Sequence, residues 1–184
     1  MGASDFSKLP HIGEALRRKE DYRFLTGAGN YTDDIRLDNM THAVFVRSPH
    51  AHANIKSINK AAALAAPGVV AVLDGPDVVD AKINGLPCGW LITDTSGKPM
   101  NEPPHPILAN GKVRYVGDHV AMVVAETLEQ AKNAAELVEV EYDVLPAVVD
   151  VRQAKSATAL HAEAPNNHCY NWACLLYTSD AADE

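Results

Sequence analysis

Cysteine and aromatic residues are scarce in this chain of 184 residues. The three cysteines are Cys88, Cys169 and Cys174, and aromatic side chains make up only 6% of the residues. Structural zinc sites and iron–sulfur clusters need several clustered ligands, so cysteines this far apart exclude such a centre built from cysteine alone. Free thiols at wide spacing are also typical of a reducing compartment, and we expect a cytoplasmic protein.

The chain also lacks long apolar runs and an excess of basic residues. No stretch approaches the ~20 apolar residues of a membrane helix, and the first twenty residues lack a signal-peptide core. We therefore expect neither a membrane span nor export by a signal of its own. The formal net charge is −8, and the single basic run, residues 17–19, is followed by Glu20 and Asp21. This balance excludes a nucleic-acid-binding protein, and we interpret the basic run as a solvated, self-paired segment.

What the sequence does contain is alternating apolar segments of strand and helix length. Thr127 and Gln130 form a capping box before a helix, because Leu128, Ala131, Ala134, Ala135 and Val138 follow at helical spacing. Two strand–helix–strand units would form right-handed βαβ units if their strands are parallel. The sequence thus predicts a small α/β (α+β) domain with a mixed sheet. Its expected strands are 41–47, 53–58, 69–73, 120–125 and 138–143, and its expected helices are 60–65 and 128–138.

Turns and loops separate these elements. Asp74-Gly75-Pro76 and Asn110-Gly111 read as turns, the latter a hairpin turn. The stretch 83–106 holds five prolines, and a loop of that length is more often functional or partner-facing than filler. Residues 1–32 lack sustained periodicity, so we expect an extended arm that packs over another surface.

Two glycine-containing segments could indicate phosphate binding. Gly27-Ala28-Gly29 opens like a dinucleotide loop, but Thr32 replaces the third glycine and no strand precedes it. Gly111-Lys112 is followed by valine and lacks the upstream glycine spacing of a phosphate loop. A simple turn is the favoured interpretation of both.

Histidine and carboxylate pairs are the other candidates. His50 and His52 could face one way from a strand like two metal ligands, but no third ligand is grouped with them, so a structural or partner-contact role is favoured. Asp33 and Asp34 are adjacent, and adjacent carboxylates on a strand point apart. We therefore assign no catalytic, cofactor-binding or metal-ligating residue.

Several phrases, taken in order, resemble one known family. They are RKEDYRFLTGAGNYTDDI (18–35), VRSPHAHANI (46–55), APGVVAVL (66–73), VRYVGDHVA (113–121) and VEVEYDVLPAV (138–148), followed by Leu160-His161, Ala164-Pro165, Asn167 and residues 170–172. Together they resemble the start of molybdopterin-binding large subunits of the xanthine dehydrogenase and aldehyde oxidase family. The carbon monoxide dehydrogenase type is the most similar, and the resemblance covers residues 11–173.

The resemblance implies an α/β hammerhead domain of a molybdenum hydroxylase. Such enzymes insert water-derived oxygen into an aldehyde, a nitrogen heterocycle or carbon monoxide. The molybdenum–pterin cofactor would be bound by later domains of the same subunit, so no ligand carries over to this sequence. Electrons would pass to iron–sulfur centres and FAD, expected on a small and a medium partner subunit. The arm and the stretch 99–106 would be subunit or domain contacts, and the phrase holding His50 and His52 would be scaffold.

The expected organisation follows from the same resemblance. Residues 1–21 would be the N-terminal arm, 22–149 the hammerhead domain, and 150–173 a linker into a molybdenum-binding domain. Residues 174–184 read as a translated sequencing-library adapter and not as native protein. On this interpretation the chain is an inactive fragment of an oxidoreductase. The alternative is a stand-alone, non-catalytic interaction module whose chain ends near residue 184.

Overall fold

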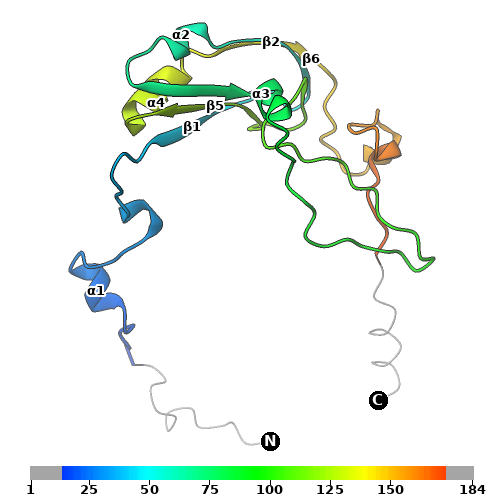
Figure 1. The fold of residues 1–184 in the computed structure, drawn as a ribbon. Helices are drawn as coiled ribbons and strands as arrows, with labels where there is room; N and C mark the ends of the chain where they lie inside the picture. Colours follow the sequence, from blue (N-terminus) through cyan, green and yellow to red (C-terminus); the bar gives the residue numbers. More distant parts are fainter. Residues whose placement is uncertain (1–13, 173–184) are drawn as a thin grey trace, which may run out of the picture. The chain divides into compact units, whose positions relative to one another are not determined.

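The computed structural model describes residues 14–172 of the chain, which Figure 1 draws in colour. The chain falls into two compact units, residues 1–40 and residues 41–184. All of the strands found among the described residues belong to the second unit. The adapter-like residues 174–184 lie outside the described residues, and so do residues 1–13 of the predicted arm.

The first unit adds a short helix to the predicted arm. It holds α1 (Asp21–Leu25) and a turn of 3₁₀ helix, η2 (Thr32–Asp34), and no residue of either is buried. The rings of Phe24 and Tyr31 stack with their centroids 5.5 Å apart. A helix of one turn has little stability of its own in water, so this unit depends on contacts beyond its helix.

The first sheet is built around one buried strand. β5 (His119–Ala125) lies at its centre, with β1 (His42–Arg47) and β3 (Val69–Asp74) paired antiparallel on its two sides. Val120, Ala121, Val123 and Ala125 are fully buried. The continuous apolar run 120–125 predicts such a strand, and the structure confirms it.

Two helices cover this sheet. α4 (Leu128–Ala135) packs on β1 and β5, and α2 (Ala61–Leu64) contacts β3 and α4. Ala63, Ala131 and Ala134 are fully buried, because alanine lets a helix approach a sheet closely. The capping box is confirmed: the Thr127 hydroxyl accepts from the Gln130 amide, and the Gln130 side chain accepts from the Thr127 amide.

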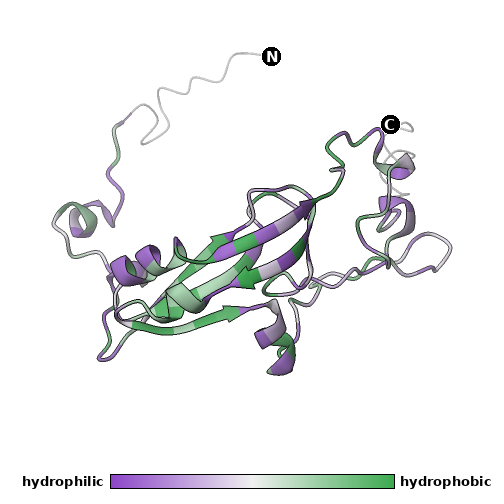
Figure 2. Cartoon of the chain, turned by 90° about the horizontal axis from the view of Figure 1, so that it is seen from above, coloured by the Kyte–Doolittle hydropathy of each residue, from purple (hydrophilic) through white to green (hydrophobic). Residues whose placement is uncertain are grey.

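The second sheet has the order β4–β2–β6, from β4 (Lys112–Val113), β2 (Ala53–Asn59) and β6 (Glu139–Val144). Its core cluster contains Ala53, Ala109 and Val113, joined by Val120 of the first sheet. β6 alternates between exposed acids and half-buried apolar side chains, as its sequence pattern predicts. Figure 2 shows hydrophobic residues gathered along the strands.

The α/β class and the strand–helix–strand order are confirmed, but the prediction of a mixed sheet is wrong. Every strand pairing in the two sheets is antiparallel. α2 leads from β2 in the second sheet to β3 in the first, and α4 leads from β5 in the first to β6 in the second. A parallel crossover needs a dozen or more residues, and here the helices, four and eight residues long, pass the chain from one sheet to the other.

The turn predicted at residues 74–76 is the start of a helix, α3 (Gly75–Asp80). Asp74 is its N-cap and accepts a hydrogen bond from the amide of Asp77, whose own side chain accepts from the amide of Asp74. Pro76 sits in the first turn, where its missing N–H is no loss. Reading glycine and proline as a turn overlooked this reciprocal cap. At Asn110-Gly111 the chain does turn, with Gly111 at φ +71°, but it leads into β4, which pairs with β2.

Candidate functional site

The long proline-containing loop forms an irregular hairpin, which we name the loop arm (residues 83–107). The amide of Leu86 donates to the carbonyl of His105 at 2.8 Å, and the amide of Met100 donates to the carbonyl of Ile92 at 2.9 Å. Figure 1 shows the loop arm in green, extending from the end of α3 away from the two sheets. The prediction of a long loop here is confirmed.

The tip of the loop arm is closed by an aspartate. One bridge pairs Thr93 with Pro99, and inside it the Asp94 carboxylate accepts from the Ser96 hydroxyl at 2.6 Å and from the amides of Ser96 and Lys98, both at 2.9 Å. These hydrogen bonds favour the ionised form and lower the pKa of Asp94. The tip is therefore an ordered turn rather than a loose end.

The residues after β6 also fold into a compact loop, which we name the exit segment (residues 150–172). It contains two single turns of 3₁₀ helix, η3 (Ala154–Ser156) and η4 (Pro165–Asn167). Asn167 organises it: its side-chain oxygen accepts from the amide of Leu160 at 2.7 Å, and its side-chain nitrogen donates to the carbonyls of Ala154 at 2.9 Å and Thr158 at 3.1 Å. Asn167 has a φ of +52°, a conformation that asparagine tolerates better than most residues.

One asparagine joins the loop arm to the exit segment. The Asn101 amide donates to the carbonyl of Cys169 at 2.7 Å, and its side-chain nitrogen donates to the carbonyl of His168 at 2.9 Å. Both backbone acceptors would otherwise lack partners from a strand or helix. The loop arm and the last described part of the chain are thus held side by side.

A cavity of about 300 Å³, the polar pocket, lies where the loop arm, the β4–β5 turn and the exit segment meet. His105, Arg114, Tyr115, Asp118 and His161 line it together with two prolines of the loop arm. The Arg114 Nε donates to the carbonyl of Leu160 at 3.0 Å, and the Arg114 amide donates to the Asp118 carboxylate at 3.0 Å. The first bond fastens the exit segment to the turn that follows β4, and the second closes that turn.

Burial shifts the pKa of two side chains of the polar pocket, His161 and Tyr115. Burial lowers the pKa of His161, and the positive charge of Arg114 lowers it further. Its Nδ1 is buried and has no hydrogen-bond partner. Burial and the negative charge of Asp118 raise the pKa of Tyr115. At neutral pH His161 is therefore neutral and Tyr115 is a protonated phenol.

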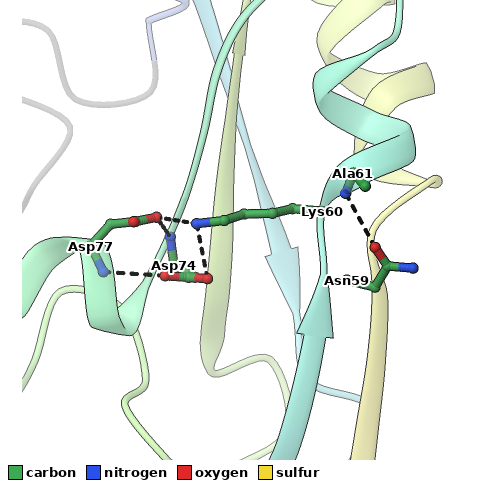
Figure 3. A network of polar contacts seen from close by, with 5 residues as sticks. All are labelled: Asn59, Lys60, Ala61, Asp74 and Asp77. Atoms are coloured by element: carbon green, nitrogen blue, oxygen red, sulfur yellow. Dashed lines mark hydrogen bonds and ion pairs between the residues drawn. The ribbon is translucent and has the colours of Figure 1, made fainter.

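A second polar cluster links α2 to α3. Figure 3 shows the Lys60 side chain reaching Asp74, at 3.1 Å, and Asp77. Burial opposes the charge of Lys60, but hydrogen bonds to Asp77 and Asp74 outweigh it and raise the pKa of Lys60. The same bond from Lys60 lowers the pKa of Asp77. Because Asp74 and Asp77 also cap α3, we interpret the cluster as a structural joint.

Each of the other candidates from the sequence makes local structural contacts. The buried His52 bonds the carbonyl of Pro146 through Nδ1 at 2.8 Å, and His50 packs edge-on against Tyr142 with ring centroids 5.0 Å apart. Gly27 follows α1 with a φ of +73°, as a turn requires. Asp34 accepts a hydrogen bond from the amide of Tyr31 and so closes η2.

Sequence reasoning missed the residues that assemble these segments, namely Asn101, Arg114 and Asn167. Only Asn167 carried a local signal, because asparagine after Pro165-Asn166 indicates a turn with a left-handed residue. The partners of Asn101 and Arg114 lie 67 and 46 residues away. No spacing rule predicts contacts at that separation.

The described residues do not offer a metal site. Within residues 14–172 no group of three or more histidine, cysteine, aspartate or glutamate side chains is placed to hold a metal ion. Cys88 and Cys169 are both free. In the same part of the chain, no helix has the length and apolar character to cross a membrane.

Comparison with known families decides the assignment. The family described as aldehyde oxidase and xanthine dehydrogenase, a/b hammerhead domain, matches residues 26–146. The chain belongs to this family. The two antiparallel sheets, their covering helices and the loop arm are therefore a hammerhead domain, as the resemblance implies.

Relatives of the hammerhead domain are large subunits of oxidoreductases. The carbon monoxide dehydrogenase large chain of Afipia carboxidovorans is 38% identical over 90% of this chain, which covers 21% of that protein. The xanthine dehydrogenase molybdenum-binding subunit of Escherichia coli O157:H7 is 34% identical over 74% of this chain and 18% of its own length. Each of these names describes one chain or subunit of an enzyme.

A solved structure agrees with this fold. Quinoline 2-oxidoreductase from Pseudomonas putida 86 is 43% identical to this chain, with a TM-score of 0.65. The match covers 78% of this chain and 17% of the quinoline enzyme's chain. The chain thus spans about a fifth of the length of the relatives that it matches.

Proposed function

We propose that this chain is the hammerhead part of the large subunit of a molybdenum hydroxylase and that it serves as scaffold, not as catalyst. The observation that carries the proposal is the match to the hammerhead family over residues 26–146, together with 38% identity to only 21% of a carbon monoxide dehydrogenase large chain.

The complete enzyme, in this proposal, uses a molybdenum–pterin cofactor to insert water-derived oxygen into a small substrate. In this proposal the cofactor would be held by sequence that follows the hammerhead domain in the full-length subunit. Carbon monoxide, an aldehyde or a nitrogen heterocycle is the proposed substrate class. Partner subunits carrying iron–sulfur centres and FAD would take the electrons.

The proposed organisation keeps residues 1–21 as an arm, 22–149 as the hammerhead domain and 150–173 as the lead into a cofactor-binding domain, with 174–184 as adapter translation. We further propose a cytoplasmic enzyme, which the free cysteines Cys88 and Cys169 support. The bonds from Asn101 and Arg114 hold the exit segment against the hammerhead domain. They support the proposal that residues 150–172 are a linker packed on that domain.

The alternative is a stand-alone interaction module. The hydrogen bonds that order the exit segment favour it, because a compact segment of this kind can close a fold. The reading frame in an independent assembly of the source genome separates the two. We expect it to continue past residue 173 into glycine-rich, cofactor-binding sequence. A stop codon near residue 184 in independent reads would reject the enzyme proposal and support the module.

A further inference from the structure

We infer that the loop arm is a docking surface for the polypeptide that follows the hammerhead domain in the same subunit, with Trp90 and Leu91 as its apolar anchors. The inference rests on the proposed function, because it requires that such a polypeptide exists. Beyond the proposed function, the inference names the residues that make the contact and the polypeptide that covers them.

The loop arm exposes large apolar side chains that it does not pack itself. Trp90 is 71% exposed, Leu91 is 64% exposed and Leu86 is 59% exposed. The charges in this part of the loop arm are few: the Asp94 carboxylate accepts hydrogen bonds at the tip and feels the positive charge of Lys98, and Glu102 accepts from the amide of Cys88. A tryptophan that becomes buried on binding is a frequent energetic centre of an interface.

The loop arm is also held in one shape before it binds. Its limbs are bonded between Leu86 and His105 and between Met100 and Ile92, and its tip is closed around Asp94. Its prolines restrict the backbone further. A surface that is already ordered loses little conformational entropy on docking, which leaves more of the apolar burial as binding free energy.

The hydrogen bonds of Asn101 indicate which polypeptide covers the loop arm. They fix the backbone of His168 and Cys169 against the loop arm at Asn101, so a polypeptide that continues the exit segment would start beside the loop arm. A segment tethered there has a high effective concentration at Trp90, whereas a separate subunit or a second copy must arrive from solution. The relatives contain a large remainder to supply this segment, because this chain covers only 21% of the carbon monoxide dehydrogenase large chain.

The native thiol of Cys88 is a reporter within this surface. It is exposed, and its Sγ lies 3.3 Å from the carbonyl of Trp90. We would label the 184-residue chain and the full-length large subunit with an uncharged maleimide and follow the Cys88 peptide by mass spectrometry. Because thiol reactions require access, we expect labelling at least about tenfold slower in the full-length subunit at every protein concentration.

Two substitutions in the full-length subunit make the test specific. Trp90→Ser should return Cys88 labelling toward the rate of the 184-residue chain. Val70→Ser, on the similarly exposed (61%) side chain of β3, should leave Cys88 protected. Equal labelling of Cys88 in the fragment and in the full-length subunit would overturn the inference.

The same experiment separates the rival occupants. Protection that depends on protein concentration would assign the surface to a second copy, and protection that needs added partner subunits would assign it to a partner. Either result would overturn the inference. Molybdenum content and turnover are measured on the same full-length sample: a molybdenum-free, inactive protein with protected Cys88 refutes the proposed function alone, and an active one with accessible Cys88 refutes the docking alone.

Discussion

Single side chains hold the segments that leave the hammerhead sheets. The Asn167 side chain makes four hydrogen bonds within the exit segment, while its neighbour Asn166 shares the left-handed backbone, with a φ of +58°, and is exposed. The two asparagines therefore separate a backbone preference from a side-chain role. Few loops contain such a matched pair.

Asn167→Ala should destabilise the exit segment by about 2–3 kcal/mol, because it leaves backbone groups unpaired and puts alanine in a left-handed conformation. Asn166→Ala should cost only about 1 kcal/mol, from the backbone alone. Hydrogen exchange of residues 150–172 measures both. Equal effects of the two substitutions would show that the side-chain bonds of Asn167 contribute nothing.

His161 should make the stability of the fold depend on pH. Its pKa in the folded state lies below the ordinary 6.5, so the unfolded chain takes up a proton first. The stabilising contribution is complete above pH 6.5 and is lost as the pH falls through the lower folded pKa. Denaturation between pH 5 and pH 8 should show this loss in the natural chain and a smaller one in His161→Phe. An unchanged slope in the variant would contradict the assignment.

At the scale of elements, the alanine-rich face of α4 packs on the first sheet and buries it. Ala131 and Ala134 are fully buried, whereas Ala135 is half-buried and packs at the edge of the core cluster. Ala134→Asp should destabilise the domain by about 3 kcal/mol or more, since it buries an unpaired charge. Asn133→Asp, on the exposed face of the same helix, is the control and should be close to neutral in urea denaturation. A neutral Ala134→Asp would contradict the packing of α4 on β1 and β5.

The cap of α3 gives a second prediction for an element. Asp74→Ala should cost about 1–2 kcal/mol, because it removes the N-cap of α3 and one partner of Lys60. Asp80→Ala, at the exposed end of the same helix, should be nearly silent.

The contribution of Asp77 to stability is present above pH 3.8 and fades as the pH falls through its lower folded pKa. Thermal melts of both variants at pH 7 and pH 3 measure these effects. Equal melting temperatures of the two variants at pH 7 would contradict a structural role for the cluster of Lys60, Asp74 and Asp77.

How far each element could be predicted depends on where its determinants lie. The run 120–125 and the capping box at Thr127 are local, and the sequence predicts both. The sheet partners of β2 and β6 depend on which faces meet in three dimensions, so the local pattern predicted a mixed sheet where two antiparallel sheets form. α3 was missed because the signal of Gly75-Pro76 for a turn concealed the cap made by Asp74 and Asp77.

At the scale of the molecule, the family was visible from the order of several phrases, whereas the docking surface was not. The composition of residues 99–106 predicted a contact region, yet the exposed anchors Trp90 and Leu91 lie outside it. The junction of Asn101 with Cys169 joins residues that the sequence places far apart. Tertiary hydrogen bonds of this kind leave no periodic trace in a sequence.

The scaffold role of this chain is the central claim, and one measurement tests it most directly: molybdenum content and substrate-dependent dye reduction of the purified 184-residue chain beside the full-length subunit assembled with its partners. The substrates are carbon monoxide, an aldehyde, a purine and a quinoline. We predict molybdenum and turnover of one of these substrates in the assembled enzyme, and neither in the 184-residue chain. A 184-residue chain that retains molybdopterin and turns over substrate would contradict the account.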